Sequence, residues 1–485
     1  MRTNQLGRRP APVSGGPGAD TRPGVRTAVA LVAFLLFAVV FPLEIRDAGA
    51  VYFTDADFLI RYAVALYAAV KLALLLWHSD IRPMAAVFWI FVYTGMGLAP
   101  LAQLTTGRST AVAVQVDDVA LTTTSLLTLV GCVCFDVAYH LRLRKHGREP
   151  QLRFRTLRSM DVLRVFSVAA VVAALVYVVQ AGGLSVFFLS RQEAGHALDE
   201  ISPDSGHALR AIISSAGSVG CLTALIFYLH VWRTRDRALA AVDGLLMAAL
   251  LAMNIVVNNP VSNSRYWTLA VLFGLMLPLI RGRKNLFNAA VVGGVIASIV
   301  IFPLSDITRR AGGQGTPVNL DSVWIVIATK DYDQFTMLAN TLAYTDNNGF
   351  SWGLQALGPL LFWVPRVIWA NKPLDTGVEV GQWMNSVNLN LSAPLWAEAW
   401  INFGLPGLIL VFAALGMLSR RLDSGFRAEI LSKGAVGYLG ISILAGYLFI
   451  LLRGSLLQSM GRLMILVLSV AILTAVTNRR ERLQP

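Results

Sequence analysis

The stretch LFNAAVVGGVIASIVIFPL, residues 286–304, contains no charged residue and is bounded by basic residues on one side and a polar segment on the other. An apolar helix of about 20 residues spans the hydrocarbon core of a bilayer. The whole chain shares this character: 55% of its 485 residues are hydrophobic, 14% are charged, and the mean hydropathy is +0.61. This composition does not suit a water-soluble globular protein and predicts an integral membrane protein.

Twelve runs of this kind follow one another along the chain. Each is predicted to cross the membrane as a helix, because a backbone in lipid must satisfy its hydrogen bonds internally, and the runs are too long for barrel strands. The runs are 27–43, 58–77, 84–104, 119–140, 162–181, 209–231, 238–257, 266–280, 286–304, 400–418, 435–452 and 463–476. The predicted fold is therefore an all-α polytopic membrane protein, with nine helices in residues 27–304 and three in residues 399–477.

The distribution of Lys and Arg predicts how these helices are oriented. With the N-terminus inside, 26 basic residues fall in inner segments, 11 fall in outer segments and four lie within runs. Positive charge accumulates on the cytoplasmic side of membrane proteins. We therefore expect a multi-pass protein of the cytoplasmic membrane with both termini in the cytoplasm. Residues 1–26, rich in Pro, Gly and Arg, are predicted to be a disordered basic segment, and residues 478–485 a short cytoplasmic tail.

The net charge of +13 needs no nucleic-acid partner, because basic inner loops bind anionic membrane lipids. Cys132, Cys134 and Cys221 fall within predicted helices, so they indicate neither a disulfide framework nor a metal site. We find no nucleotide-binding motif and no fixed internal repeat, and we expect no cofactor.

Residues 305–398 form the longest segment between two apolar runs and are predicted to be a large extracytoplasmic loop. Apolar residues recur at roughly helical spacing over residues 318–344, which predicts an amphipathic helix lying at the interface or on the protein. Residues 352–369 are apolar but interrupted by Gly358-Pro359 and Pro365. Such interruptions favour a re-entrant or interfacial segment over a thirteenth crossing.

Several cations are predicted to lie close to the outer face, where the positive-inside tendency disfavours them. They are Arg191, Arg210, Arg265, Arg309, Arg310, Arg366, Lys372, Arg453 and Arg462. The planar guanidinium suits phosphate oxygens, so together these residues favour a pyrophosphate site just below the outer surface. For any one of them taken singly, we favour an interfacial anchor or the partner of a nearby carboxylate.

The chain also resembles a known family in its short motifs. PRVIW at 365–369, followed by Lys372-Pro373 and Gly377, is similar to the outer loop of Wzy-type O-antigen and exopolysaccharide repeat-unit polymerases, which carry an R-x10-G pattern. Asn263-Ser264-Arg265, Asn402-Phe403-Gly404 and Arg453-Gly454 resemble further family segments. Arg191 does not begin a second R-x10-G pattern, because the position where the pattern requires Gly, 202, is Ser.

The resemblance implies an activity. Such a polymerase transfers a growing glycan from undecaprenyl pyrophosphate to another lipid-linked oligosaccharide repeat unit, without nucleotide or metal. Together with the outer-face cations described above, the resemblance leads us to expect that Arg265, Arg309, Arg310, Arg366, Lys372 and Arg453 bind the pyrophosphate or the glycan. Arg191 is a further candidate whose position does not match the family motif. The resemblance also implies a chain-length regulator and a flippase as partners. Guanidinium groups placed where charge develops on the leaving pyrophosphate would stabilise the transition state.

Glycosyl transfer also needs a base for the acceptor hydroxyl. A carboxylate partly removed from water can serve when its pKa is raised. We favour Glu398, because it ends the apolar stretch 393–398 at the start of a predicted helix, with Asp375 and Glu379 as further candidates. Each can instead be a solvated loop carboxylate or an ion-pair partner, and for Asp331 and Asp333 we favour that interpretation.

Two other functions fit the same composition. A related ligase would hand the glycan to a different acceptor, but such enzymes usually show a histidine in the large outer loop, and none lies between residues 305 and 398. A flippase or transporter of lipid-linked oligosaccharides would also suit twelve helices. Transporters commonly show repeated halves and functional charge deep in their helices, whereas this chain shows no twofold repeat and places most of its candidate charges at the outer rim.

The loop motif leads to a direct prediction. Arg366→Ala is expected to abolish long polysaccharide while protein level and membrane insertion stay normal, because the pyrophosphate loses a bidentate partner. Arg366→Lys should restore only part of the chain length, since it keeps the charge without the planar fork. Gel analysis of the glycan measures both, and wild-type chain length in Arg366→Ala would contradict the predicted role.

Overall fold

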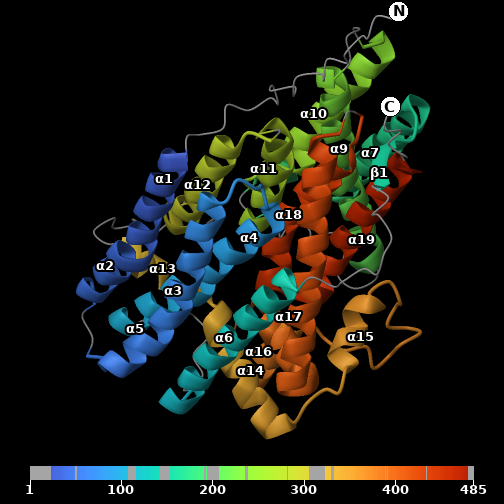
Figure 1. The fold of residues 1–485 in the computed structure, drawn as a ribbon. Coiled ribbons are helices and arrows are strands. Elements are labelled where there is room, and N and C mark those ends of the chain that lie inside the picture. The colour runs from blue at the N-terminus through green and yellow to red at the C-terminus, as the bar shows by residue number, and fades with distance from the viewer. Residues whose placement is uncertain are drawn as a thin grey trace, which may run out of the picture.

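The computed structural model is mostly helical (Figure 1). It describes residues 23–49, 52–107, 116–141, 153–189, 193, 207–234, 239–280, 282–304, 323–328, 332–387, 389, 391–432 and 434–478. The elements of the first half are α1 (Pro23–Leu35), η1 (Leu36–Val40), α2 (Phe41–Asp47), α3 (Asp55–Trp77), α4 (Pro83–Phe91), η2 (Val92–Leu98), α5 (Ala99–Thr106), α6 (Asp118–His140), β1 (Arg153–Leu157), α7 (Met160–Gln180), η3 (Leu184–Phe188) and α9 (His207–Thr234). Those of the second half are α10 (Ala241–Val257), α11 (Arg265–Ile280), α12 (Lys284–Leu304), α13 (Val323–Ile327), α14 (Gln334–Asn348), α15 (Leu354–Leu360), α16 (Thr376–Trp383), α17 (Leu395–Ile430), α18 (Gly437–Arg453), α19 (Leu456–Leu473) and β2 (Thr474–Asn478).

Each of the twelve predicted runs overlaps helical structure. Among the described residues, eight helical segments are long and apolar enough to cross a membrane, counting α1–η1–α2 and α4–η2–α5 as one segment each. Four shorter apolar helices, α10, α11, α12 and α18, coincide with the remaining runs. The predicted class, a helical multi-pass membrane protein, is confirmed; the count of twelve crossings stays a prediction.

Several helices extend beyond the predicted apolar runs. Helix α17 extends from Leu395 to Ile430, beyond the predicted 400–418, and consists of two helical pieces that meet at a kink, where the backbone of Phe403 and Gly404 is not helical. Arginines near its end favour helix although they end the apolar run. Helix α19 begins at Leu456 rather than at 463. Helix α1 begins at Pro23, so 23–26 are helical rather than disordered; residues 1–22 lie outside the described part of the chain.

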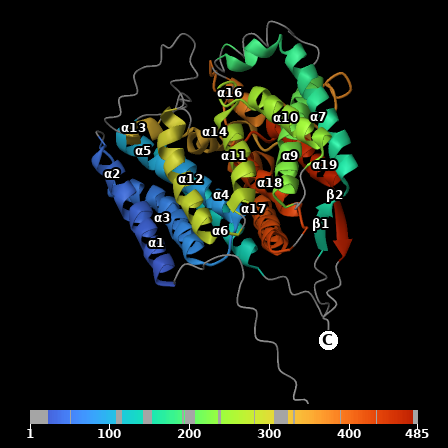
Figure 2. The same cartoon turned by 90° about the horizontal axis from the view of Figure 1, so that it is seen from above.

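A small sheet departs from the all-helical prediction. Strand β1 pairs antiparallel with β2, from Arg153 opposite Asn478 to Leu157 opposite Thr474, and the two lie side by side in Figure 2. Thr156 also forms a bridge with Ala435. Threonine and valine in β2 suit an extended strand. The sheet joins the beginning of α7, the beginning of α18 and the end of α19 at one end of the bundle, called here the sheet end.

Segments predicted to be cytoplasmic also contact one another. The Lys284 Nζ donates to the carbonyl oxygens of Leu75, at 2.8 Å, and Asp80, at 3.1 Å. Arg427 forms an ion pair with Asp80. These contacts join the segments before α4, before α12 and at the end of α17, as expected if alternate connections lie on one side of the membrane.

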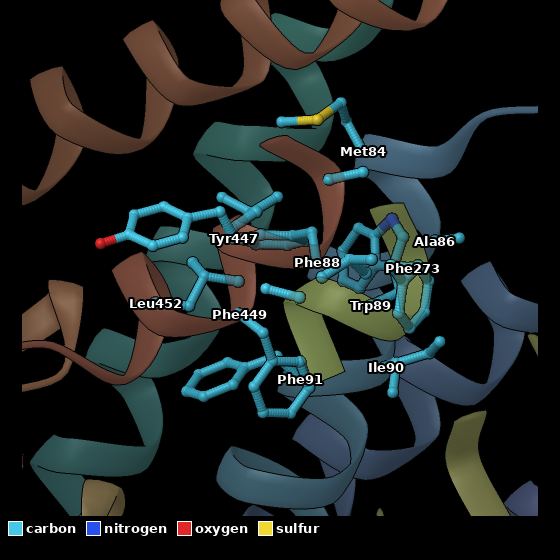
Figure 3. Close-up of a cluster of buried hydrophobic side chains, with 14 of the residues drawn as sticks. Met84, Ala86, Phe88, Trp89, Ile90, Phe91, Phe273, Tyr447, Phe449 and Leu452 are labelled. Carbon is cyan, nitrogen blue, oxygen red and sulfur yellow. The ribbon is translucent and has the colours of Figure 1, made fainter. Parts of the chain in front are cut away.

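The buried centre of the bundle is formed by α4 with α11 and α18 (Figure 3). Phe88 stacks on Phe135 of α6 with ring centroids 3.6 Å apart, and Phe91 meets Phe449 of α18 edge-on at 5.1 Å. Trp396 is fully buried against Phe412, with ring centroids 4.3 Å apart.

The segment 332–387 places further helices at the opposite end of the bundle. Helix α14 is buried nearly all round rather than amphipathic, and packs against α6 and α17. Its polar side chains Gln334, Asn340 and Thr341 are buried with its apolar ones, which explains why hydropathy alone suggested an exposed face. The interrupted stretch 352–369 contains one short helix, α15, which lies at the edge of the bundle in Figure 1.

A buried carboxylate secures the N-terminus of α4. Asp423 of α17 is 0% exposed and accepts hydrogen bonds from the backbone N–H groups of Met84, at 2.8 Å, and Ala85, at 3.2 Å. The Tyr139 hydroxyl of α6 donates to it at 2.7 Å. One side chain thereby satisfies two helix-terminal N–H groups and joins three helices.

Asp423→Ala is expected to lower the free energy of unfolding by about 2–4 kcal/mol, because it leaves buried donors without an acceptor. A denaturant titration of the purified protein in detergent measures this. Asp161→Ala is the control, since that carboxylate is 85% exposed and is expected to leave the midpoint unchanged. Equal midpoints for the two variants would contradict the capping role.

Candidate functional site

Residues 453–456, called here the α18–α19 junction, occupy the end of the bundle opposite the sheet. Gly454 has φ +75° and ψ 178°, a combination that is essentially confined to glycine. A Cβ at Gly454 would lie 1.6 Å from the carbonyl oxygen of Ala393. Only glycine therefore lets the junction pack directly on the segment that enters α17.

Asp375 contacts the junction from the large loop. Its Oδ1 accepts the backbone N–H of Gly377 at 2.9 Å, which caps α16, and its Oδ2 accepts the hydroxyl of Ser455. The carboxyl is only 7% exposed. Burial raises the pKa of Asp375, and the hydrogen bonds from Ser455 and Gly377 oppose this in part. The group is thus a buried acid held in one orientation.

Glu398 contacts the next residue of the junction. Its Oε1 accepts the backbone N–H of Leu456 at 3.0 Å, and its Oε2 accepts the hydroxyl of Thr376 at 2.9 Å. The side chain lies in the first turn of α17 and is 4% exposed. Leu456 begins α19, whose unpaired N–H groups and dipole favour a negative charge at this position. Glu398 and Asp375 are therefore bonded to consecutive junction residues.

Glu379, the third predicted carboxylate, lies beside this pair. It accepts the Tyr344 hydroxyl at 2.7 Å and the side-chain amide of Gln355. The Gln355 carbonyl oxygen lies 3.5 Å from the Thr376 hydroxyl, which donates to Glu398. The structure therefore brings the three carboxylates proposed from sequence into one polar network.

Three arginines gather at the first turn of α11. The Arg453 guanidinium lies 4.6 Å above the ring of Tyr266, and that of Arg462 lies 4.8 Å above the ring of Trp267. Arg265 begins the helix and is 8% exposed. Guanidinium groups beside a helix N-terminus form a positive region suited to an anion. Asp333 reduces this charge in part, since its Oδ1 lies 3.6 Å from Arg453 Nη2.

The two cations of the predicted loop motif contact their own backbone. Arg366 donates to the carbonyl oxygens of Lys372, at 2.7 Å, and Pro373, at 3.2 Å. The Lys372 Nζ donates to those of Phe362, at 2.7 Å, and Val364, at 3.0 Å. Burial, with Arg366 nearby, lowers the pKa of Lys372. Both side chains thus shape the loop, and substrate binding by them stays a prediction.

Arg191, Arg309 and Arg310 lie outside the described residues. Within the described ranges, no group of three or more His, Cys, Asp or Glu side chains is arranged to hold a metal ion.

Sequence reasoning missed the side chains that hold the carboxylates. Thr376, Gln355, Tyr344 and Ser455 are ordinary polar residues, and only the Asp-Thr-Gly order at 375–377 gives a local signal, that of a helix cap. Ser455 and Leu456 reach the site across 80 and 58 residues of chain. No spacing rule relates such positions.

The close approach at Gly454 can be tested by adding one methyl group. Gly454→Ala is expected to reduce the yield of folded protein and lower the thermal midpoint, because the backbone must move off Ala393 and also adopt a strained φ, which alone costs about 1–3 kcal/mol. Gly461→Ala is the matched control, since its Cβ would meet only ordinary contacts at 3.7 Å and 3.8 Å. Indistinguishable melting curves for these variants would contradict the packing described.

Comparison of the chain with protein-family models, with curated proteins and with solved structures found no match.

Proposed function

We propose that this protein is a lipid-linked glycan polymerase of the cytoplasmic membrane. It transfers a growing glycan from undecaprenyl pyrophosphate to the sugar end of another lipid-linked repeat unit at the outer face. The proposal includes twelve membrane crossings, both termini in the cytoplasm, and residues 305–398 outside. Eight long and four shorter apolar helices support this topology.

The observation that carries the proposal is the composition of the α18–α19 junction. Arg453 turns toward the positive first turn of α11, whereas Ser455 and Leu456 hold Asp375 and Glu398. Transfer from a pyrophosphate needs cations for the leaving group and a carboxylate for the acceptor. Residues 453–456, at one end of the helix bundle, contact both the cationic region at α11 and the two carboxylates.

The proposed reaction forms one bond and breaks one. The acceptor hydroxyl oxygen bonds to the anomeric carbon of the donor glycan, and the bond from that carbon to the pyrophosphate oxygen breaks. The electron pair leaves with undecaprenyl pyrophosphate, whose growing charge the arginines at α11 stabilise. The hydroxyl proton passes to a carboxylate, with Glu398 preferred over Asp375 and Glu379. Since Glu398 and Thr376 are buried, the proposed reaction requires a local rearrangement that admits the acceptor to Glu398.

A transporter of the same lipid-linked unit is the second candidate. Lys71 of α3 and Asp136 of α6 form an ion pair, with side chains 18% and 15% exposed, inside segments predicted to cross the membrane. The Tyr67 hydroxyl donates to the same carboxylate at 2.8 Å. Charged groups within a membrane are costly and often functional, so this pair is the feature that favours transport.

The two candidates separate in one experiment. The purified protein in nanodiscs is given a short lipid-pyrophosphate-linked repeat unit without nucleotide, and glycans are resolved on a gel. A ladder of increasing length is expected from a polymerase. Movement of the intact unit across sealed vesicles without a ladder would favour the transporter instead.

Glu398→Gln tests the base in the same assay. It keeps the side-chain shape but removes the charge, so the rate of ladder formation is expected to fall about 100-fold or more. Glu429→Gln is the matched control, because Glu429 is also buried on α17 but lies at the sheet end. If folded Glu398→Gln kept the wild-type rate, Glu398 would not be the base.

A further inference from the structure

A shallow, open cleft lies between α9, α11 and α18, far from the α18–α19 junction. It lies at the sheet end, because Tyr438, one of its lining residues, follows closely on Ala435, which bridges to β1. Its walls are apolar, and its rim is polar. The wall residues are Ile226, Leu229, Leu275, Pro278 and Leu279, and the rim residues are His230, Arg233, Thr234 and Tyr438.

The rim presents its polar groups in one direction. His230, Arg233 and Thr234 stand at i, i+3 and i+4 in the last turn of α9, so they share a helix face. His230 Nδ1 lies 2.9 Å from the Tyr438 hydroxyl, which fixes the imidazole against α18. Arg233 is exposed. Arg233 thus places a positive charge at the mouth of the cleft, and among the described residues no carboxylate forms an ion pair with it.

The walls indicate what else an occupant needs. Leu279 is 51% exposed, and Leu229 and Leu275 are half-buried, on helices that are predominantly apolar. A free phosphate would leave these surfaces uncovered. An acyl chain would cover them while its phosphate met Arg233, whose planar fork suits phosphate oxygens.

We propose that this cleft binds one anionic phospholipid of the membrane leaflet at the sheet end, with the phosphate on Arg233 and His230 and an acyl chain along Leu229, Leu275 and Leu279. The site is independent of the proposed glycan transfer. A bound lipid contacts α9, α11 and α18 together, so it stabilises the folded protein by an amount that grows with the logarithm of the lipid concentration above the dissociation constant.

The test uses the full chain purified in detergent and stripped of lipid. Thermal midpoints are measured with phosphatidylglycerol, phosphatidylcholine or inorganic phosphate added to the micelles. Phosphatidylglycerol is expected to raise the midpoint, and the other two are not. Arg233→Gln removes one charge-assisted contact with the phosphate. About ten times more phosphatidylglycerol is therefore expected to be needed for the same rise of the midpoint.

Two further variants separate this cleft from general attraction to a basic surface. Arg421 is an exposed arginine in the second half of α17 and does not line the cleft. Arg421→Gln is therefore expected to respond to lipid like the wild type. Leu229→Trp fills the cleft without changing charge and should abolish the effect. Equal losses in Arg233→Gln and Arg421→Gln, an equal rise with phosphatidylcholine, or an equal rise with inorganic phosphate would each overturn the proposal.

Discussion

The contact between Gly454 and the carbonyl of Ala393 is the constraint on which the site depends. Because no Cβ intervenes, the end of α18 and the start of α19 lie against the backbone that leads into α17. This approach brings the N–H of Leu456 to Glu398 and the hydroxyl of Ser455 to Asp375. A side chain at position 454 would separate the carboxylates from the groups that orient them.

Charge at this end of the bundle is divided between two regions. The carboxylates lie among hydrogen-bond donors at the beginnings of α16 and α19, whereas Arg453 and Arg462 stack on aromatic rings at the beginning of α11. Stacking on a ring holds a guanidinium in place. Buried surroundings strengthen both kinds of interaction relative to water. The arrangement suits chemistry in which negative charge moves from an acceptor to a leaving group.

The helices could be predicted from the sequence because membrane crossing imposes length and apolarity on contiguous residues. Glu398 could be singled out for a related reason, since a carboxylate that ends an apolar run is conspicuous. The partners of Glu398 could not, because Thr376 and Leu456 reach it only through tertiary packing. The burial of α14 was missed because its polar residues pack inside the protein. The contacts of Arg366 with its own loop also need coordinates, since a motif records residue types but not their partners.

The most direct test of glycan transfer measures the lipid product. The purified protein in nanodiscs is given a lipid-pyrophosphate-linked repeat unit, and undecaprenyl pyrophosphate is quantified by mass spectrometry beside the glycosidic bonds formed. Polymerisation predicts one undecaprenyl pyrophosphate released for each new bond, with no nucleotide consumed. Recovery of the lipid-linked unit intact, with no pyrophosphate lipid released, would contradict the assignment.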